Sequence, residues 1–90
     1  MKTEQELQYQ RMKQLTAKGY YVLRLYRTNK NGIPDLIAIP VGTKAGNTKV
    51  RFSEVKRRGK KPAPLQRYRI EELKAHGFEV EIYDGEVHDV

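Results

Sequence analysis

The chain has 90 residues, which is enough for one domain with a modest core, and we expect residues 1–90 to fold as a unit. Its 18 lysines and arginines outnumber its 11 acidic residues, and the net charge of +7 favours polyanionic partners such as nucleic acid. The absence of cysteine excludes disulfides, thiolate zinc sites and cysteine nucleophiles, and no apolar stretch approaches the length of a membrane span.

The first half of the chain predicts one helix and two strands. Thr3 is suited to cap a helix whose first turn is acidic, and Gly19 is suited to end it. A run of aromatic and branched residues over 20–26 predicts a strand, and a short apolar run over 35–39 predicts another. The glycines within 41–47 then predict a hairpin loop.

The second half predicts two strands separated by a helix. Strict alternation over 48–56 indicates a strand. Pro64 is well placed as the first residue of a helix that Gly77 ends. A last strand is expected over 78–83, after which we expect 84–90 to fray. Short loops predict an antiparallel meander for the first three strands, with the second helix crossing over to the fourth.

The third predicted strand carries charges where a continuous apolar face is expected. With a period of two, Val50, Phe52, Glu54 and Lys56 share one face. Two apolar residues followed by two charged ones indicate a face that is buried at first and then opens into a cleft. A Glu and a Lys two residues apart can also form a plain structural ion pair, and for the strand considered alone this is the better interpretation.

Asp35 changes that balance, because it begins a strand directly after the Gly-Ile-Pro of 32–34, which gives it a defined direction. An aspartate before a strand is otherwise commonly a turn residue. Carboxylates that converge at one strand end, such as Asp35 and Glu54, can hold a hard divalent cation such as Mg²⁺, with the Val55 carbonyl as a further ligand. Such an ion activates a water, and Lys56 could orient that water or neutralise charge on a phosphate. The set therefore favours phosphodiester hydrolysis.

A third carboxylate can come from the first helix. At about 100° per residue, Glu4 falls within the arc of Leu7, Met12 and Leu15, whereas Glu6 falls on the solvent side. A glutamate on a core-facing stripe is costly unless it has a partner, so Glu4 is the candidate to reach the metal or the lysine. The alternative is equally acceptable: a frayed helix end would leave Glu4 in water, where its charge suits the helix dipole.

Three stretches, GIPDLIAIP, FSEVK and PLQRYRIEELKAHG, resemble in this order and spacing the virus-type replication-repair nuclease (VRR-NUC) family of the PD-(D/E)xK superfamily. The Pro-Asp motif of the family corresponds to Pro34-Asp35, and its Glu-x-Lys motif to Glu54-Val55-Lys56. A Gln at the start of the following helix corresponds to Gln66. The family's glutamate before a Leu-Gln matches Glu4 best, with Glu6 as a close competitor.

This resemblance implies a mixed sheet flanked by helices, in the order α-β-β-β-α-β, with Mg²⁺ or Mn²⁺ dependence and endonuclease activity on DNA. Members consisting of this domain alone resemble phage or bacterial proteins that dimerise and cut branched DNA, including four-way (Holliday) junctions. Symmetric cutting of two strands by a chain with one site also predicts a homodimer. We therefore expect a cytoplasmic endonuclease for branched or supercoiled DNA, in a bacterium or a phage-infected cell. The alternative is a DNA-binding module that keeps the fold without catalysis.

Further residues have weaker assignments. A basic loop follows the third strand at the mouth of the expected cleft, and we expect its side chains to hold DNA phosphates rather than to form a merely solvated loop: Arg57, Arg58, Lys60 and Lys61. Gln66 could orient a water or the DNA backbone, or be a helix residue without function. The six tyrosines are expected to pack in the core or a dimer interface rather than to stack on bases.

Overall fold

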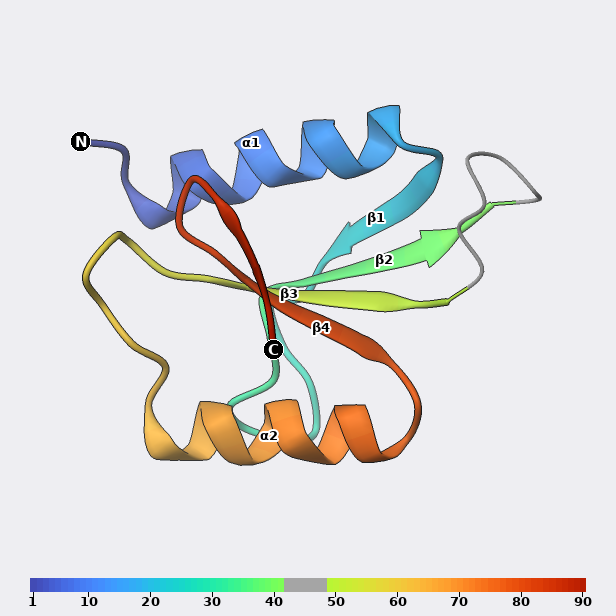
Figure 1. Cartoon of the computed structure of the whole chain (residues 1–90), viewed down its shortest axis with the longest axis vertical. Helices are drawn as coiled ribbons and strands as arrows, with labels where there is room; N and C mark the ends of the chain where they lie inside the picture. Colours follow the sequence, from blue (N-terminus) through green and yellow to red (C-terminus); the bar gives the residue numbers. More distant parts are fainter. Residues whose placement is uncertain (42–48) are drawn as a thin grey trace.

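The computed structural model describes residues 1–41 and 49–90 (Figure 1). The hairpin loop expected over 41–47 lies outside these residues apart from Val41. Within the described residues, none of the helices is long and apolar enough to cross a membrane. The described elements, in chain order, are α1 (Glu4–Ala17), β1 (Tyr20–Arg24), β2 (Leu36–Pro40), β3 (Arg51–Val55), α2 (Pro64–Ala75), β4 (Glu79–Tyr83) and β5 (Val87–Asp89).

One sheet contains the strands in the order β1-β2-β3-β4-β5. The first three strands form antiparallel pairs, as expected for a meander. Strands β3 and β4 run parallel, and α2 connects them across one face of the sheet. The prediction of a mixed sheet flanked by helices is therefore confirmed.

The end of the chain contains a strand that the sequence did not reveal. Residues Val87–Asp89 pair antiparallel with β4. In the turn before them, Asp84 Oδ1 accepts a hydrogen bond from the Glu86 N–H at 3.0 Å. Gly85 has a φ of 111°, which glycine adopts without steric cost. The prediction that 84–90 fray was wrong, because β5 is held through backbone pairing while its side chains stay exposed and show no apolar pattern.

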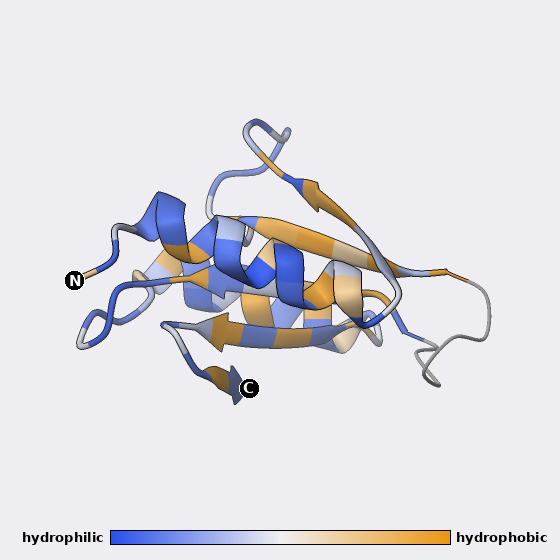
Figure 2. Ribbon diagram, turned by 90° about the horizontal axis from the view of Figure 1, so that it is seen from above, coloured by the Kyte–Doolittle hydropathy of each residue, from blue (hydrophilic) through white to orange (hydrophobic). Residues whose placement is uncertain are grey.

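The two helices cover opposite faces of the sheet (Figure 1). The face of α1 turned away from the sheet is mostly hydrophilic, as Figure 2 shows. Each large side chain buried between helix and sheet contributes roughly 1.5–3 kcal/mol. The buried apolar residues lie in one cluster on the α2 side, Phe52, Ile70 and Val80, and in two that include α1 residues, Leu7, Leu36, Val55 and Tyr83, then Leu15, Tyr20 and Ala38.

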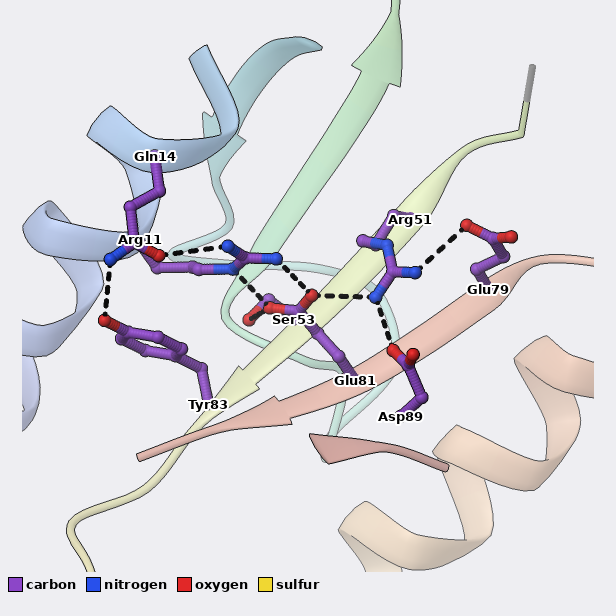
Figure 3. Close-up of polar contacts among 8 residues, drawn as sticks. All are labelled: Arg11, Gln14, Arg51, Ser53, Glu79, Glu81, Tyr83 and Asp89. Carbon is purple, nitrogen blue, oxygen red and sulfur yellow. Dashed lines mark hydrogen bonds and ion pairs between the residues drawn. The ribbon is translucent and has the colours of Figure 1, made fainter. Parts of the chain in front are cut away.

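A charged layer lies within the α1 side of the core (Figure 3). Glu81 of β4 is fully buried, and the Arg11 guanidinium donates to both of its carboxylate oxygens, at 2.6 and 2.7 Å. Ser53 and Arg51 of β3 donate to the same carboxylate at 2.7 and 2.8 Å. Burial opposes the ionisation of Glu81, but the hydrogen bonds from Arg11 and Ser53 outweigh it and hold the pKa of Glu81 below its ordinary value. This layer ties α1 to β3 and β4.

Candidate active site

Both helices begin at the end of the molecule at which β3 finishes (Figure 1). Asp35 immediately precedes β2, and the antiparallel register pairs Leu36 with Ser53. This register places Asp35 beside the last residues of β3, and its Oδ2 accepts a hydrogen bond from the Val55 N–H at 2.8 Å. The structure thus brings Asp35 and Glu54 to one strand end, as the sequence predicts.

Glu54 and Lys56 lie on the face of β3 that turns toward α2. Glu54 shares this face with Phe52, which packs against Ile70 of α2. The Lys56 Nζ lies 3.8 Å from Glu54 Oε2, and the exposed fraction of the side chain rises from 2% for Glu54 to 18% for Lys56. Exposure therefore increases toward the end of this face, as expected, whereas the cleft expected there stays a prediction.

The loop before Asp35 packs tightly against the first turn of α2. Gly32 has a φ of 81°, and a Cβ added there would lie 2.8 Å from the Leu65 Cγ. Only glycine therefore permits this close approach without a shift of the loop or of the helix. Pro34 is buried directly before the catalytic candidate. The direction of Asp35 is consequently set by packing, as the Gly-Ile-Pro sequence suggests.

Gln66, in that same first turn of α2, makes two contacts. Its Oε1 accepts a hydrogen bond from the Ala63 N–H at 2.8 Å, which satisfies a free donor at the helix start. Its Nε2 donates to Glu54 Oε2 at 3.2 Å. Gln66 thus connects the start of α2 to Glu54, and a role in orienting a water or the DNA backbone stays a prediction.

Both carboxylates resist ionisation. Burial is the main cause for Glu54, the negative charge of Asp35 adds to it, and Lys56 opposes them, so that the pKa of Glu54 rises to about 8. Burial also raises the pKa of Asp35, against the hydrogen bond from Val55, and the charge of Glu4 raises it further. A nearby cation would lower both pKa values, because opposite charge favours the ionised form.

The pair fits a hard divalent cation. Glu54 Oε1 is buried and accepts no hydrogen bond from the described residues, although buried carboxylate oxygens are normally satisfied. The Glu54 and Asp35 carboxyl groups are close enough to share a proton in the metal-free protein, and a bound cation would take the place of that proton. Within 1–41 and 49–90, no group of three His, Asp or Glu side chains is arranged to hold a metal ion. Two carboxylates are nevertheless the set that Mg²⁺ commonly takes from a protein, because it keeps several waters. The Val55 carbonyl as a ligand stays a prediction.

The structure gives the two acidic residues in the first turn of α1 different environments. Glu6 closes a capping box: its Oε1 accepts from the Thr3 N–H at 2.9 Å, and its own N–H donates to Thr3 Oγ1 at 3.1 Å. Glu4 is half-buried, and its charge raises the pKa of both Asp35 and Glu54. Of the two, Glu4 is therefore the carboxylate whose charge acts on the site, whereas direct binding of a metal by Glu4 stays a prediction.

The predicted basic loop leaves β3 next to these residues. Arg57 is half-buried, and Lys60 and Lys61 are exposed. Arg58 is directed instead to the β4–β5 turn, where it donates to Glu86 at 2.9 Å and lies 3.9 Å from Asp84. The four residues thus do not form one uniform patch, and their contacts with DNA stay predictions.

The raised pKa of Glu54 predicts how stability changes with pH. A carboxyl group that titrates near 8 in the folded chain and near 4.5 when unfolded is more protonated in the folded state between those values. We therefore expect the metal-free protein to lose stability as the pH rises from about 5 to about 8. Mg²⁺ should raise the melting temperature, and more at pH 8 than at pH 5.5. Thermal unfolding followed by circular dichroism, with chelator or Mg²⁺, measures both.

Glu54→Gln is the matched variant for this prediction, because it keeps the shape of the side chain and removes the titration. Its stability should depend much less on pH in that interval, and Mg²⁺ should stabilise it little. A metal-free wild-type protein that is as stable at pH 8 as at pH 5.5 would contradict the prediction.

Comparison with known proteins agrees with this geometry. The family model of the VRR-NUC domain matches residues 2–86. A solved structure of a VRR-NUC domain superposes with a TM-score of 0.70 and 28% identity, covering 88% of this chain and 81% of that chain. No curated protein matches the chain. VRR-NUC domains are nuclease-type domains and are typically metal-dependent. The chain belongs to the VRR-NUC family.

Proposed function

We propose that this protein is a metal-dependent endonuclease that hydrolyses phosphodiester bonds in DNA. The observation that carries the proposal is the meeting of Asp35, Glu54 and Lys56 at the end of β3, where one buried carboxylate oxygen of Glu54 accepts no hydrogen bond from the described residues. Such an arrangement is costly for a structural site, because two adjacent buried carboxyl groups lose hydration and cannot both ionise without repelling each other. It becomes favourable once a divalent cation is bound.

Each residue has a distinct task in the proposed reaction. Asp35 and Glu54 hold Mg²⁺ or Mn²⁺, which when bound polarises the phosphate and lowers the pKa of a water. The Lys56 ammonium is available to orient the attacking water and to stabilise charge that develops on the phosphate. Gln66 holds Glu54 in place through its amide, and Glu4 adds negative charge that strengthens the attraction for the cation.

DNA is the proposed substrate because the chain is strongly basic and the basic loop begins directly after Lys56. Arg57, Lys60 and Lys61 have no ion pair among the described residues, so their charges remain available for phosphates. The rival function is DNA binding without catalysis. It leaves the buried carboxylate pair unexplained, because acidic groups beside a bound phosphate weaken binding unless a cation lies between them.

Branched or supercoiled DNA, four-way junctions included, is the finer part of the proposal. The described residues bring together one such site per chain, so paired cuts in two strands need two protomers related by a twofold axis, and we propose a homodimer. The cytoplasm of a bacterium or a phage-infected cell, where such DNA is found, is the proposed location. Sedimentation that gives the 10.5 kDa mass of one chain during active cleavage would remove the dimer from the proposal.

A cleavage assay tests the function directly. The purified chain is incubated with four-way junction, flap, linear and supercoiled DNA in Mg²⁺, Mn²⁺ or chelator. We expect products with either metal, none with chelator, and none from Asp35→Asn, which keeps a side-chain oxygen to accept the Val55 N–H. Salt-sensitive binding that ignores metal, with no product from any substrate, would replace the nuclease by the DNA-binding module.

A further inference from the structure

Two exposed tyrosines and an arginine form a stack beside the candidate site. The Arg24 guanidinium lies 5.0 Å from the ring centroid of Tyr9 and 4.2 Å from that of Tyr26, and so connects a residue of α1 to one that follows β1. The exposed fractions of Tyr9 and Tyr26 are 48% and 77%. Tyr20 and Tyr83 are buried, as expected of core tyrosines, but the Tyr9–Arg24–Tyr26 stack is not.

The stack is close to Asp35 in the sheet. Arg24 pairs with Leu36 across the β1–β2 ladder, and the Leu25 N–H donates to the Asp35 carbonyl at 2.8 Å. Cross-strand partners project to the same face of a sheet, and Leu36 packs on Leu7 of α1. The stack therefore lies on the α1 side of the site, opposite the side on which Gln66 contacts Glu54.

The loop that follows the stack is positively charged. Between Arg24 and Asp35 the chain contains two basic residues, Arg27 and Lys30, and no acidic one. Tyr26 lines a hollow of about 290 Å³ together with Arg27 and Lys30, and this hollow extends to Gly32, three residues before Asp35. Arg24 has no acidic partner among the described residues. A ligand that suits both features has flat aromatic groups and negative charge.

We infer that the Tyr9–Arg24–Tyr26 stack binds an unpaired nucleobase of the DNA substrate, with Arg27 and Lys30 contacting the adjacent phosphates. This inference rests on the proposed nuclease function and narrows its substrate. Bases inside a duplex are stacked on each other and cannot reach Tyr26, whereas a base in a flap, fork or gap can. Every base has a π-face, so such stacking selects unpaired DNA without selecting sequence.

A purely structural role for the stack makes a different prediction. Cation–π contacts at exposed sites contribute only modestly to stability, and that contribution is independent of DNA. A dimer interface through Tyr26 would likewise weaken the binding of every DNA equally once the ring is removed. Only a stacking role predicts that removal of the Tyr26 ring weakens the binding of DNA with an unpaired base more than the binding of a fully paired duplex.

The test measures binding in chelator, so that no cleavage is required. Fluorescence anisotropy compares the full chain on a blunt duplex with the chain on the same duplex bearing a short single-stranded flap. A 2-aminopurine in the flap reports stacking through its quenching. Tyr26→Ala is the variant and Tyr26→Phe its conservative partner. Tyr68→Ala is the matched control, because Tyr68 is 60% exposed on α2 and lies 5.3 Å from the Arg69 guanidinium.

We expect Tyr26→Ala to weaken binding of the flapped duplex roughly 5- to 100-fold and to abolish the quenching, with blunt-duplex binding changed less than twofold. Tyr26→Phe and Tyr68→Ala should bind both as the wild type does. Equal weakening on both DNAs, unchanged binding of the flap, or a change of oligomeric state in Tyr26→Ala would overturn the inference. The binding experiment does not depend on cleavage. A protein that cuts no DNA can therefore still show, or fail to show, stacking of an unpaired base on Tyr26, and the failure of the proposed function is distinguishable from the failure of this inference.

Discussion

Replacing Lys56 by alanine is expected to lower the rate of DNA cleavage by about a hundred- to a thousandfold without unfolding the chain. The side chain lies at the open end of its face of β3, and its Nζ is 3.8 Å from Glu54 Oε2. In the proposed reaction its charge stabilises the phosphate in the transition state, and in the structure it favours the ionised form of Glu54. Steady-state cleavage of supercoiled plasmid in excess Mg²⁺ measures the loss.

A second effect of Lys56→Ala separates this role from a structural one. Because Lys56 holds the pKa of Glu54 down, its removal should raise that pKa further and move the residual activity to higher pH. Lys13→Ala is the matched control, because it removes an exposed lysine of α1 that has no part in the proposed reaction. Cleavage by Lys56→Ala within tenfold of wild type, with an unchanged pH profile, would exclude Lys56 from the reaction.

Replacing Glu81 by alanine is expected to cost about 3–5 kcal/mol of unfolding free energy, because it leaves Arg11 buried and unpaired. Arg11 is 3% exposed, and its Nε and Nη2 both donate to the Glu81 carboxylate. Small domains are stable by only about 5–15 kcal/mol, so this single change removes a large part of the total. Urea denaturation measures the difference in unfolding free energy between the variant and the wild type, provided that both unfold with the same m-value.

The matched control is Glu71→Ala, which removes an ion pair with Lys74 in which the Glu71 side chain is 70% exposed. That change should cost less than about 1 kcal/mol. The double variant Arg11→Met with Glu81→Leu should recover most of the loss, because it removes both charges together. A cost below about 1 kcal/mol for Glu81→Ala would show that water reaches Arg11 and that the layer is not a closed part of the core.

The sequence predicts an element correctly where the spacing of its apolar residues agrees with the residues that begin or end it. The helix after Thr3 and the helix that starts at Pro64 begin where the sequence signals indicate. Strand β3 follows from its alternation, although it is shorter than the alternating stretch. What sequence reasoning missed depends on partners far away in the chain: β5 is defined by backbone pairing with β4, and Glu81 resembles an exposed strand residue until Arg11, 70 positions away, is placed over it.

For the candidate site, the sequence predicts some of the residues and the structure is needed for the others. Glu54 stands out in the sequence because it interrupts an apolar strand face, and Asp35 because it begins an apolar run directly after Gly-Ile-Pro. The choice between Glu4 and Glu6 needed the structure, because a capping box and a core-facing position are both consistent with an acidic first turn. The Tyr9–Arg24–Tyr26 stack could not be predicted, because it arises only when α1 and the edge strand are packed together.

The bond from the Val55 N–H to Asp35 Oδ2 has a consequence for folding fidelity. At this point a side chain, and not a backbone carbonyl, accepts from β3, so the β2–β3 ladder ends on the residue proposed to bind the ion. A chain that closed this hairpin two residues out of step would keep its apolar faces but separate the two acids. Only molecules with the correct strand register would then cleave DNA. The specific activity of a preparation would therefore measure the fraction of chains in that register.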